Sequence, residues 1–74
     1  MQYREIKIKE EFIRLDSALK FAALVATGGH AKTVIQNGEV EVNGEVCTQR
    51  GKKLRNGDTA VFEGKGIIIK NADK

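Results

Sequence analysis

The chain has few of the residues from which catalytic, metal and disulfide sites are usually built. It contains one cysteine, Cys47, and one histidine, His30, so it can form no internal disulfide and offers no cluster of metal ligands. A single free thiol is typical of a reducing compartment. No nucleophile stands beside a recognisable base. We therefore expect no enzyme activity and no cofactor.

Long apolar segments are also absent. The first twelve residues, MQYREIKIKEEF, alternate charged and apolar side chains, whereas a signal peptide needs an uninterrupted apolar stretch. No segment approaches the roughly 18 apolar residues of a membrane-spanning helix. These two absences indicate a cytoplasmic protein without a membrane partner.

A length of 74 residues is enough for one domain, which we place at residues 1–74. A domain this small buries roughly 60% of the surface that its unfolded chain exposes, so its core is thin. A deep cavity would use apolar residues that the core needs. The size therefore favours a binding surface over a pocket, and we expect no small-molecule substrate.

Acidic residues are missing from one stretch of the chain. Between Val46 and Gly57 there is no acid but four bases, namely Arg50, Lys52, Lys53 and Arg55. We call residues 50–55 (RGKKLR) the basic loop. The whole chain has a formal net charge of +3, and its acids gather elsewhere, at residues 10–11 and 39–45. Such segregation predicts a basic side that faces a polyanion, although a charge cluster can also be no more than a solvated face.

Hydrophobic periodicity predicts two short helices in the first half of the chain. From Leu15 to Val25 the apolar residues follow helical spacing, with Asp16 where a first-turn acid favours the helix dipole. A second helix begins after Thr27 or a following glycine, and Gly38 ends it as a left-handed residue. Because so few residues separate them, the two helices must pack as a pair.

Strands are predicted around these helices. Residues 3–10 form a first strand, residues 39–48 a hairpin around Asn43-Gly44, and residues 59–70 a closing hairpin around Gly64-Lys65. The basic loop lies between the hairpins with Leu54 as its anchor, and residues 71–74 form a tail. The resulting fold class is α+β.

The four aromatic residues do not interleave with the basic loop in the sequence. We therefore predict no platform for stacking single-stranded bases. Phe12, Phe21 and Phe62 are assigned to the core.

The start of the second helix is a further candidate site. Its free backbone N–H groups and positive dipole end suit a phosphate, and Lys32 adds a full charge one turn in. The plainer alternative is a capped helix whose polar residues face water. These polar residues, with hardly an acid among them, are His30, Lys32, Thr33, Gln36 and Asn37, and Gly29 at the helix start permits close backbone approach.

The order of these signals resembles the S4 domain, also called the alpha-L RNA-binding motif. RLD at the first helix, a second short helix, GEVEVNG as a hairpin and a basic stretch ending in NGD follow one another over about residues 14–62. GGHAKTVIQNGEVEVNGE followed by RGKKLRNGD is similar to free-standing bacterial S4 paralogues of the YaaA/YbcJ-like group. The resemblance implies two short helices packed against a small, mostly antiparallel sheet.

The resemblance also implies an RNA-binding protein without enzyme activity. Structured RNA, in particular ribosomal RNA or a ribosomal subunit, would lie across the helical face and the basic loop, in ribosome assembly or on the ribosome. Many members carry a Ser-Arg pair before the second helix, where this chain has Gly29-His30-Ala31-Lys32, so phosphate contact is better supported than sequence reading. The expected RNA-binding residues are Arg14, Asp16, Gly29, His30, Lys32, Thr33, Gln36, Arg50, Lys52, Lys53 and Arg55.

We expect a monomer, and two alternatives to RNA binding stay open. A protein-interaction module would use the edge of the hairpin or the mixed-charge first strand. A DNA-associated protein would dock its helix pair in a major groove.

Overall fold

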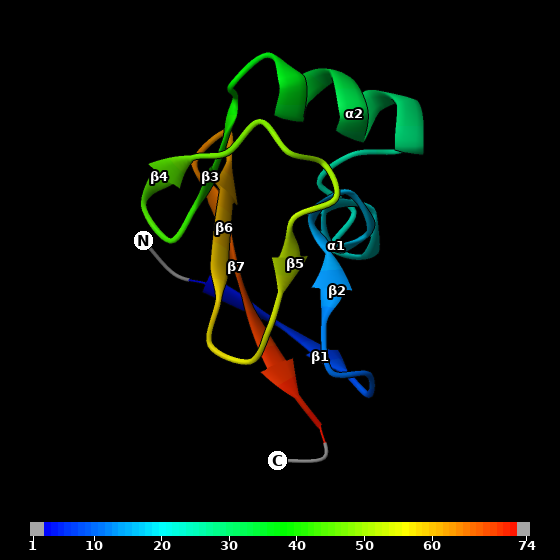
Figure 1. Cartoon of the computed structure of the whole chain (residues 1–74), viewed down its shortest axis with the longest axis vertical. Coiled ribbons are helices and arrows are strands. Elements are labelled where there is room, and N and C mark those ends of the chain that lie inside the picture. Colours follow the sequence, from blue (N-terminus) through cyan, green and yellow to red (C-terminus); the bar gives the residue numbers. More distant parts are fainter. Residues whose placement is uncertain (1–2, 73–74) are drawn as a thin grey trace.

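Seven strands and two helices form within residues 3–72, the part of the chain that the computed structural model describes (Figure 1). In chain order they are β1 (Tyr3–Ile8), β2 (Ile13–Arg14), α1 (Leu15–Phe21), α2 (Gly28–Gln36), β3 (Val40–Val42), β4 (Glu45–Val46), β5 (Lys53–Leu54), β6 (Thr59–Phe62) and β7 (Lys65–Asn71).

Five of the strands form one sheet in the order β1-β7-β6-β3-β4. The first and last strands of the chain lie side by side and run parallel, with Ile6 opposite Ile69, whereas the other neighbours in this sheet are antiparallel. Strands β2 and β5 make a separate antiparallel pair. Two helices with a small, mostly antiparallel sheet confirm the predicted α+β class.

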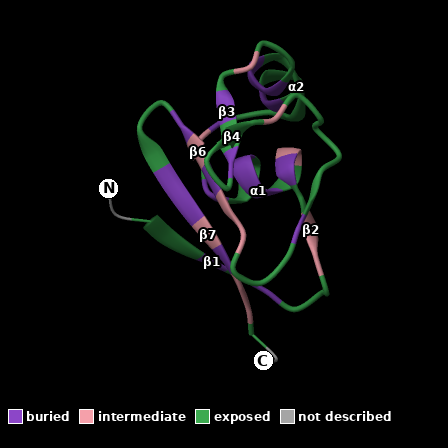
Figure 2. Ribbon diagram, turned by 60° about the vertical axis from the view of Figure 1, so that its left-hand side comes forward, coloured by how far each residue is buried: buried purple, intermediate pink, exposed green. Residues whose placement is uncertain are grey.

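The core lies between the sheet and the two helices, and Figure 2 shows buried residues in both of these layers. Period-two alternation places Ile6 and Ile8 of β1 in the interior while their neighbours stay exposed, as predicted. The largest side chains that are fully buried come from both layers and from β5: Ile6, Leu15, Leu19, Ile35, Val40, Leu54, Ile67 and Ile69.

Helix α1 ends at Phe21, so the prediction of a helix to Val25 is wrong. Ala23 adopts the left-handed conformation with φ of 60°, its N–H donates to the Lys20 carbonyl at 2.9 Å, and the N–H of Leu24 donates to the Leu19 carbonyl at 3.0 Å. This pair of hydrogen bonds is the Schellman motif, with alanine at the position where glycine is usual.

Assigning Phe21 to the core is also wrong. The helix stops at this residue, and its side chain is 63% exposed. Phe62, by contrast, is buried at the end of β6, as predicted.

Helix α2 begins and ends where the sequence predicts. The Thr27 hydroxyl accepts a hydrogen bond from the His30 backbone N–H at 3.0 Å, which satisfies one of the free donors of the first turn. Gly38 has a φ of +77°, and the N–H groups of Gly38 and Glu39 donate to the carbonyls of Ile35 and Val34. The same C-terminal motif as in α1 therefore forms here around a glycine.

The hairpins differ from their predicted bounds at the ends. The return strand β4 stops at Val46, and the closing turn is centred on Glu63 and Gly64, with φ of 54° and 75°, one residue earlier than predicted. Strand β7 continues through Asn71, so the predicted tail is wrong at this residue. The last part of that tail, residues 73–74, lies outside the described residues.

Candidate nucleic-acid interface

The backbone of the basic loop closes the N-terminus of α1. The N–H of Leu15 donates to the Lys52 carbonyl at 2.8 Å, and the N–H of Asp16 donates to the Arg50 carbonyl at 3.1 Å. The first N–H groups of a helix have no partner within the helix, and here the loop supplies the acceptors. These two bonds fix the loop to α1.

Strands β2 and β5 hold the second half of the loop. Ile13 lies opposite Leu54, and Arg14 lies opposite Lys53. Leu54 is fully buried and Ile13 is half-buried, so the alternation of a strand turns Arg14 and Lys53 outward together. The predicted role of Leu54 as the anchor of the loop is confirmed.

Phe12 lies beside the side chains of Lys53 in β5 and of Arg55, which follows this strand. The Lys53 ammonium is 4.9 Å from the centroid of the Phe12 ring, and the guanidinium carbon of Arg55 is 5.8 Å from it. Both distances are within the range of cation–π attraction. Phe12 is only half-buried, so its assignment to the core is wrong. The fold also brings an aromatic ring to the basic loop, which the spacing in the sequence does not show.

Hydrogen bonds to Asp58 and to strand β7 fix the turn that follows the basic loop. The Asp58 carboxylate accepts a hydrogen bond from the Arg55 backbone N–H at 2.8 Å, and the N–H of Gly57 donates to the Ile69 carbonyl of β7 at 2.7 Å. The N–H of Asn71 donates to the Asn56 side chain at 2.8 Å. With α1 at its start and β7 at its end, the loop is a rigid support for its charged side chains.

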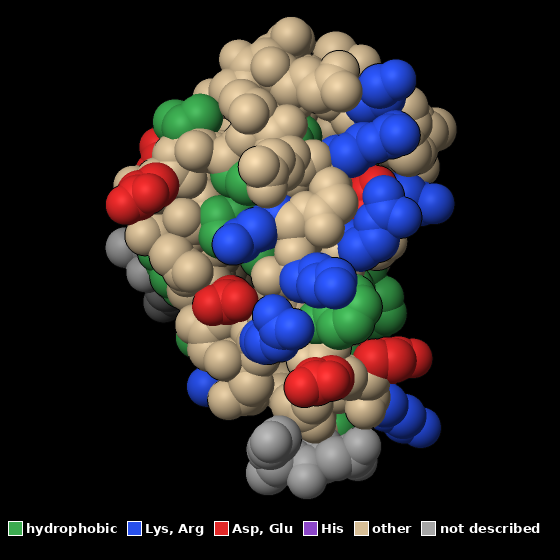
Figure 3. Space-filling view, in the orientation of Figure 1, with side chains coloured by type: hydrophobic (Ala, Val, Ile, Leu, Met, Phe, Trp, Pro, Cys, Tyr) green, Lys and Arg blue, Asp and Glu red, His purple; other side chains and the backbone are tan. Residues whose placement is uncertain are grey.

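The cations of the basic loop make no ion pair with a carboxylate in the described part of the chain. Within residues 3–72 one ion pair is present, between Arg14 Nη2 and Asp16 Oδ2 at 3.2 Å, and none involves a cation of the loop. Figure 3 shows Lys and Arg side chains gathered in a band on the face that carries the loop, with a hydrophobic patch beside it and several acidic side chains next to it. The predicted basic side of the molecule is thus present.

Gly29 and three polar residues share one face of α2. Gly29, Lys32, Thr33 and Gln36 follow the i, i+3, i+4, i+7 spacing and are exposed, while the opposite face is buried. The Thr33 hydroxyl donates to the Gly29 carbonyl at 3.0 Å. Since the first turn contains no acid, nothing on the helix itself neutralises its positive end.

His30 lies apart from these four residues. It stands one turn before the buried Val34, and its ring meets Phe62 edge-on, with 6.4 Å between centroids and 84° between planes. The imidazole is therefore turned toward the sheet side of α2.

The structure thus divides the eleven predicted residues into two groups with His30 at the margin. Arg14, Asp16 and the four bases of the basic loop are joined by strand pairing and by the bonds to α1. The second group lies on the exposed face of α2, which packs against α1. Helix α1 therefore connects the two groups.

Residues 3–72 contain neither a cluster of metal ligands nor a membrane-spanning helix. No three residues among His, Cys, Asp and Glu lie close enough to hold a metal ion there. In the same part of the chain, neither helix has the length and apolar character needed to cross a membrane.

Comparison with known proteins agrees with this architecture. The S4 domain family model matches residues 6–70. This range includes both helices and every strand, except for the first part of β1 and the end of β7. The chain is 43% identical over 61 residues to the "Probable ribosome maturation protein RlbA" of Bacillus subtilis (strain 168), and the match covers 82% of this chain and 86% of that protein. The resemblance seen in the sequence is confirmed, and the chain belongs to the S4 domain family.

Proposed function

We propose that this protein is a cytoplasmic RNA-binding protein that holds structured ribosomal RNA during ribosome maturation. The observation that carries the proposal is the basic loop, whose four cations have no carboxylate partner in residues 3–72 and whose backbone is bonded to α1. The name of the Bacillus subtilis relative supports the ribosomal context. The proposed role is binding as a monomer, without catalysis.

The loop chemistry suits the backbone of a folded RNA. The major groove of A-form RNA is too deep and narrow for side chains, so proteins grip such RNA through phosphates and 2′-hydroxyl groups. Arg50, Lys52, Lys53 and Arg55 all project from a fixed support, which lowers the entropy lost when their side chains become ordered on the RNA. Counterion release from the contacted phosphates would supply most of the affinity.

The exposed face of α2 is the proposed second contact. Lys32 carries a full charge there, and Thr33 and Gln36 offer hydrogen-bonding groups to phosphate or ribose. Arg14 adds a further cation beside the loop, with Asp16 holding its side chain at 3.2 Å. His30 lies at the margin of this surface, because its ring packs against Phe62 and its backbone N–H donates to the Thr27 hydroxyl.

The test is a salt series of binding to a structured ribosomal RNA fragment. We expect Lys53→Ala and Arg50→Ala each to weaken binding and to lower the slope of log K against log salt by about one unit, since each removes about one phosphate contact. Lys65→Ala is the matched control, because Lys65 is an exposed cation in the β6–β7 hairpin, outside the proposed surface.

Three results would contradict the proposal. Unchanged affinity and slope in both loop variants would remove the basic loop from the interface. Equal affinity for duplex DNA and folded RNA would favour the DNA-associated alternative. Partners that remain bound after nuclease treatment, without any RNA affinity of the purified protein, would favour a protein-interaction module.

A further inference from the structure

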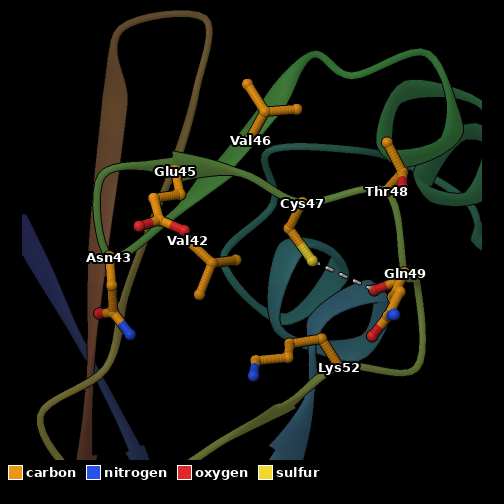
Figure 4. A pocket seen from close by; sticks show the side chains of 8 residues that line it. All are labelled: Val42, Asn43, Glu45, Val46, Cys47, Thr48, Gln49 and Lys52. Atoms are coloured by element: carbon orange, nitrogen blue, oxygen red, sulfur yellow. Dashed lines mark hydrogen bonds between the residues drawn. The ribbon is translucent and has the colours of Figure 1, made fainter.

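An open hollow lies between the β3–β4 hairpin and the start of the basic loop (Figure 4). Its volume of about 410 Å³ falls within the roughly 300–1,000 Å³ that is usual for small-molecule sites. Lys52 of the basic loop forms part of its wall, so the hollow adjoins the surface proposed to hold the RNA backbone.

The walls of the hollow are fixed by backbone hydrogen bonds. The N–H of Cys47 donates to the Val40 carbonyl at 3.0 Å, which ties the strand beyond β4 to β3. The N–H of Lys52 donates to the Gln49 carbonyl at 3.1 Å, and the Cys47 thiol donates to the same oxygen at 3.7 Å. The hollow therefore exists before any ligand arrives.

Val42 and Cys47 supply an apolar part of a lining that is otherwise mostly polar. Val42 is buried and Cys47 is half-buried, whereas Val46 is 61% exposed and is one of three large apolar side chains at the surface within residues 3–72. Figure 4 shows the Cys47 sulfur pointing into the space beside Val42. The rest of the lining is polar, so a fitting ligand combines a flat ring that covers these groups with polar edges that satisfy the surrounding polar atoms.

Two opposite charges stand at separate sides of the hollow. Glu45 comes from the hairpin and Lys52 from the loop, and no ion pair joins them. The Glu45 carboxylate repels phosphate and accepts hydrogen bonds from amino groups, whereas the Lys52 ammonium donates to carbonyl oxygens or ring nitrogens. A ligand that matches both has an amino group on one edge and an acceptor on another.

We propose that this hollow receives one unpaired nucleobase of the RNA whose phosphates contact the basic loop. Unpaired bases of loops and bulges are the parts of folded RNA that proteins read by their edges, and a flat ring with polar edges suits a lining that is partly apolar and mostly polar. Adenine, cytosine and guanine carry an exocyclic amino group, from which the Glu45 carboxylate would accept a hydrogen bond. Uracil has no such amino group. The proposal rests on the RNA-binding function proposed above and adds a base contact to it.

The first test compares an RNA hairpin carrying a single-nucleotide bulge with the same hairpin fully paired. We expect the bulged RNA to bind about tenfold more tightly, the effect of one hydrogen bond to a charged group. A bulged uracil should bind more weakly than the other three bases.

Glu45→Gln should reduce the ratio between the two affinities toward one. Glu41→Gln is its matched control, because Glu41 is an exposed glutamate of the same hairpin that does not line the hollow. Both variants lose one negative charge, so general attraction to phosphate changes equally. The control should keep the ratio of the wild type.

Cys47 gives an independent readout because it is the one thiol of the chain. Its sulfur faces the hollow, so a seated base should cover it. We expect the bulged hairpin to slow alkylation of Cys47 by N-ethylmaleimide severalfold more than the fully paired hairpin does at equal saturation.

The outcomes separate the two proposals. If both hairpins bind with the expected salt slope but equally tightly, or if alkylation of Cys47 is slowed equally by both, the base site is wrong and the backbone interface stands. A bulge preference that survives Glu45→Gln also overturns the base site. If neither hairpin binds in a salt-dependent manner, the proposed RNA-binding function is wrong, and the base site with it.

Discussion

Replacing Phe12 by leucine should weaken RNA binding without changing its salt dependence. The ring lies 4.9 Å from the Lys53 ammonium and 5.8 Å from the Arg55 guanidinium carbon, and so holds two cations in place. Ordering a long side chain on binding costs roughly 0.5–1.5 kcal/mol, so the loss of both contacts should cost about 1–2 kcal/mol. This corresponds to a roughly five- to thirtyfold loss of affinity.

The number of phosphate contacts stays the same in Phe12→Leu, and therefore the slope of log K against log salt should not change. Fluorescence anisotropy over a salt series measures both quantities at once. Phe21→Leu is the matched control, since Phe21 is exposed and no cation lies against its ring within residues 3–72. An unchanged affinity in Phe12→Leu, or a slope reduced as in Lys53→Ala, would refute the idea that the ring positions these cations.

Two predictions concern stability. Leu54→Ala removes a fully buried side chain and should cost about 2–5 kcal/mol, comparable with the whole stability of a small core, so a urea titration should find much of the variant unfolded. Ala23→Gly relieves the left-handed strain at φ of 60° and should raise stability by about 0.5–1 kcal/mol, seen as a higher thermal midpoint. A native-like midpoint in the first variant, or a lower one in the second, would contradict this reasoning.

The two helix ends show what sequence reasoning can reach. Both helices end in the same Schellman motif. The sequence predicts the end of α2 because a glycine, Gly38, stands at the position that needs a left-handed conformation. The end of α1 was missed because Ala23 has the best helix propensity of any residue type. Tertiary packing of the segment after Phe21, which buries Ala22 and Val25, overrides that propensity.

The candidate interface was predictable in its charge but not in its assembly. The run of bases without acids could be seen in the sequence, as could the anchoring role of Leu54. The proximity of Phe12 to Lys53 depends on the pairing of β2 with β5, two strands of two residues each, which are too short to give an alternation signal. The hydrogen bonds from α1 to the loop carbonyls involve backbone atoms alone, and no side-chain pattern encodes them.

The parallel pairing of β1 with β7 has a consequence for biosynthesis. A ribosome produces β1 first, yet the strand beside which it lies is made last, after every other element. Until then Ile6 and Ile8 lack their neighbours Ile69 and Asn71 across the ladder, and the sheet has an open apolar edge. Such nonlocal closure is slow and exposes the nascent chain to misassembly. We therefore expect stalled or truncated chains that lack β7 to be prime substrates for chaperones and proteases.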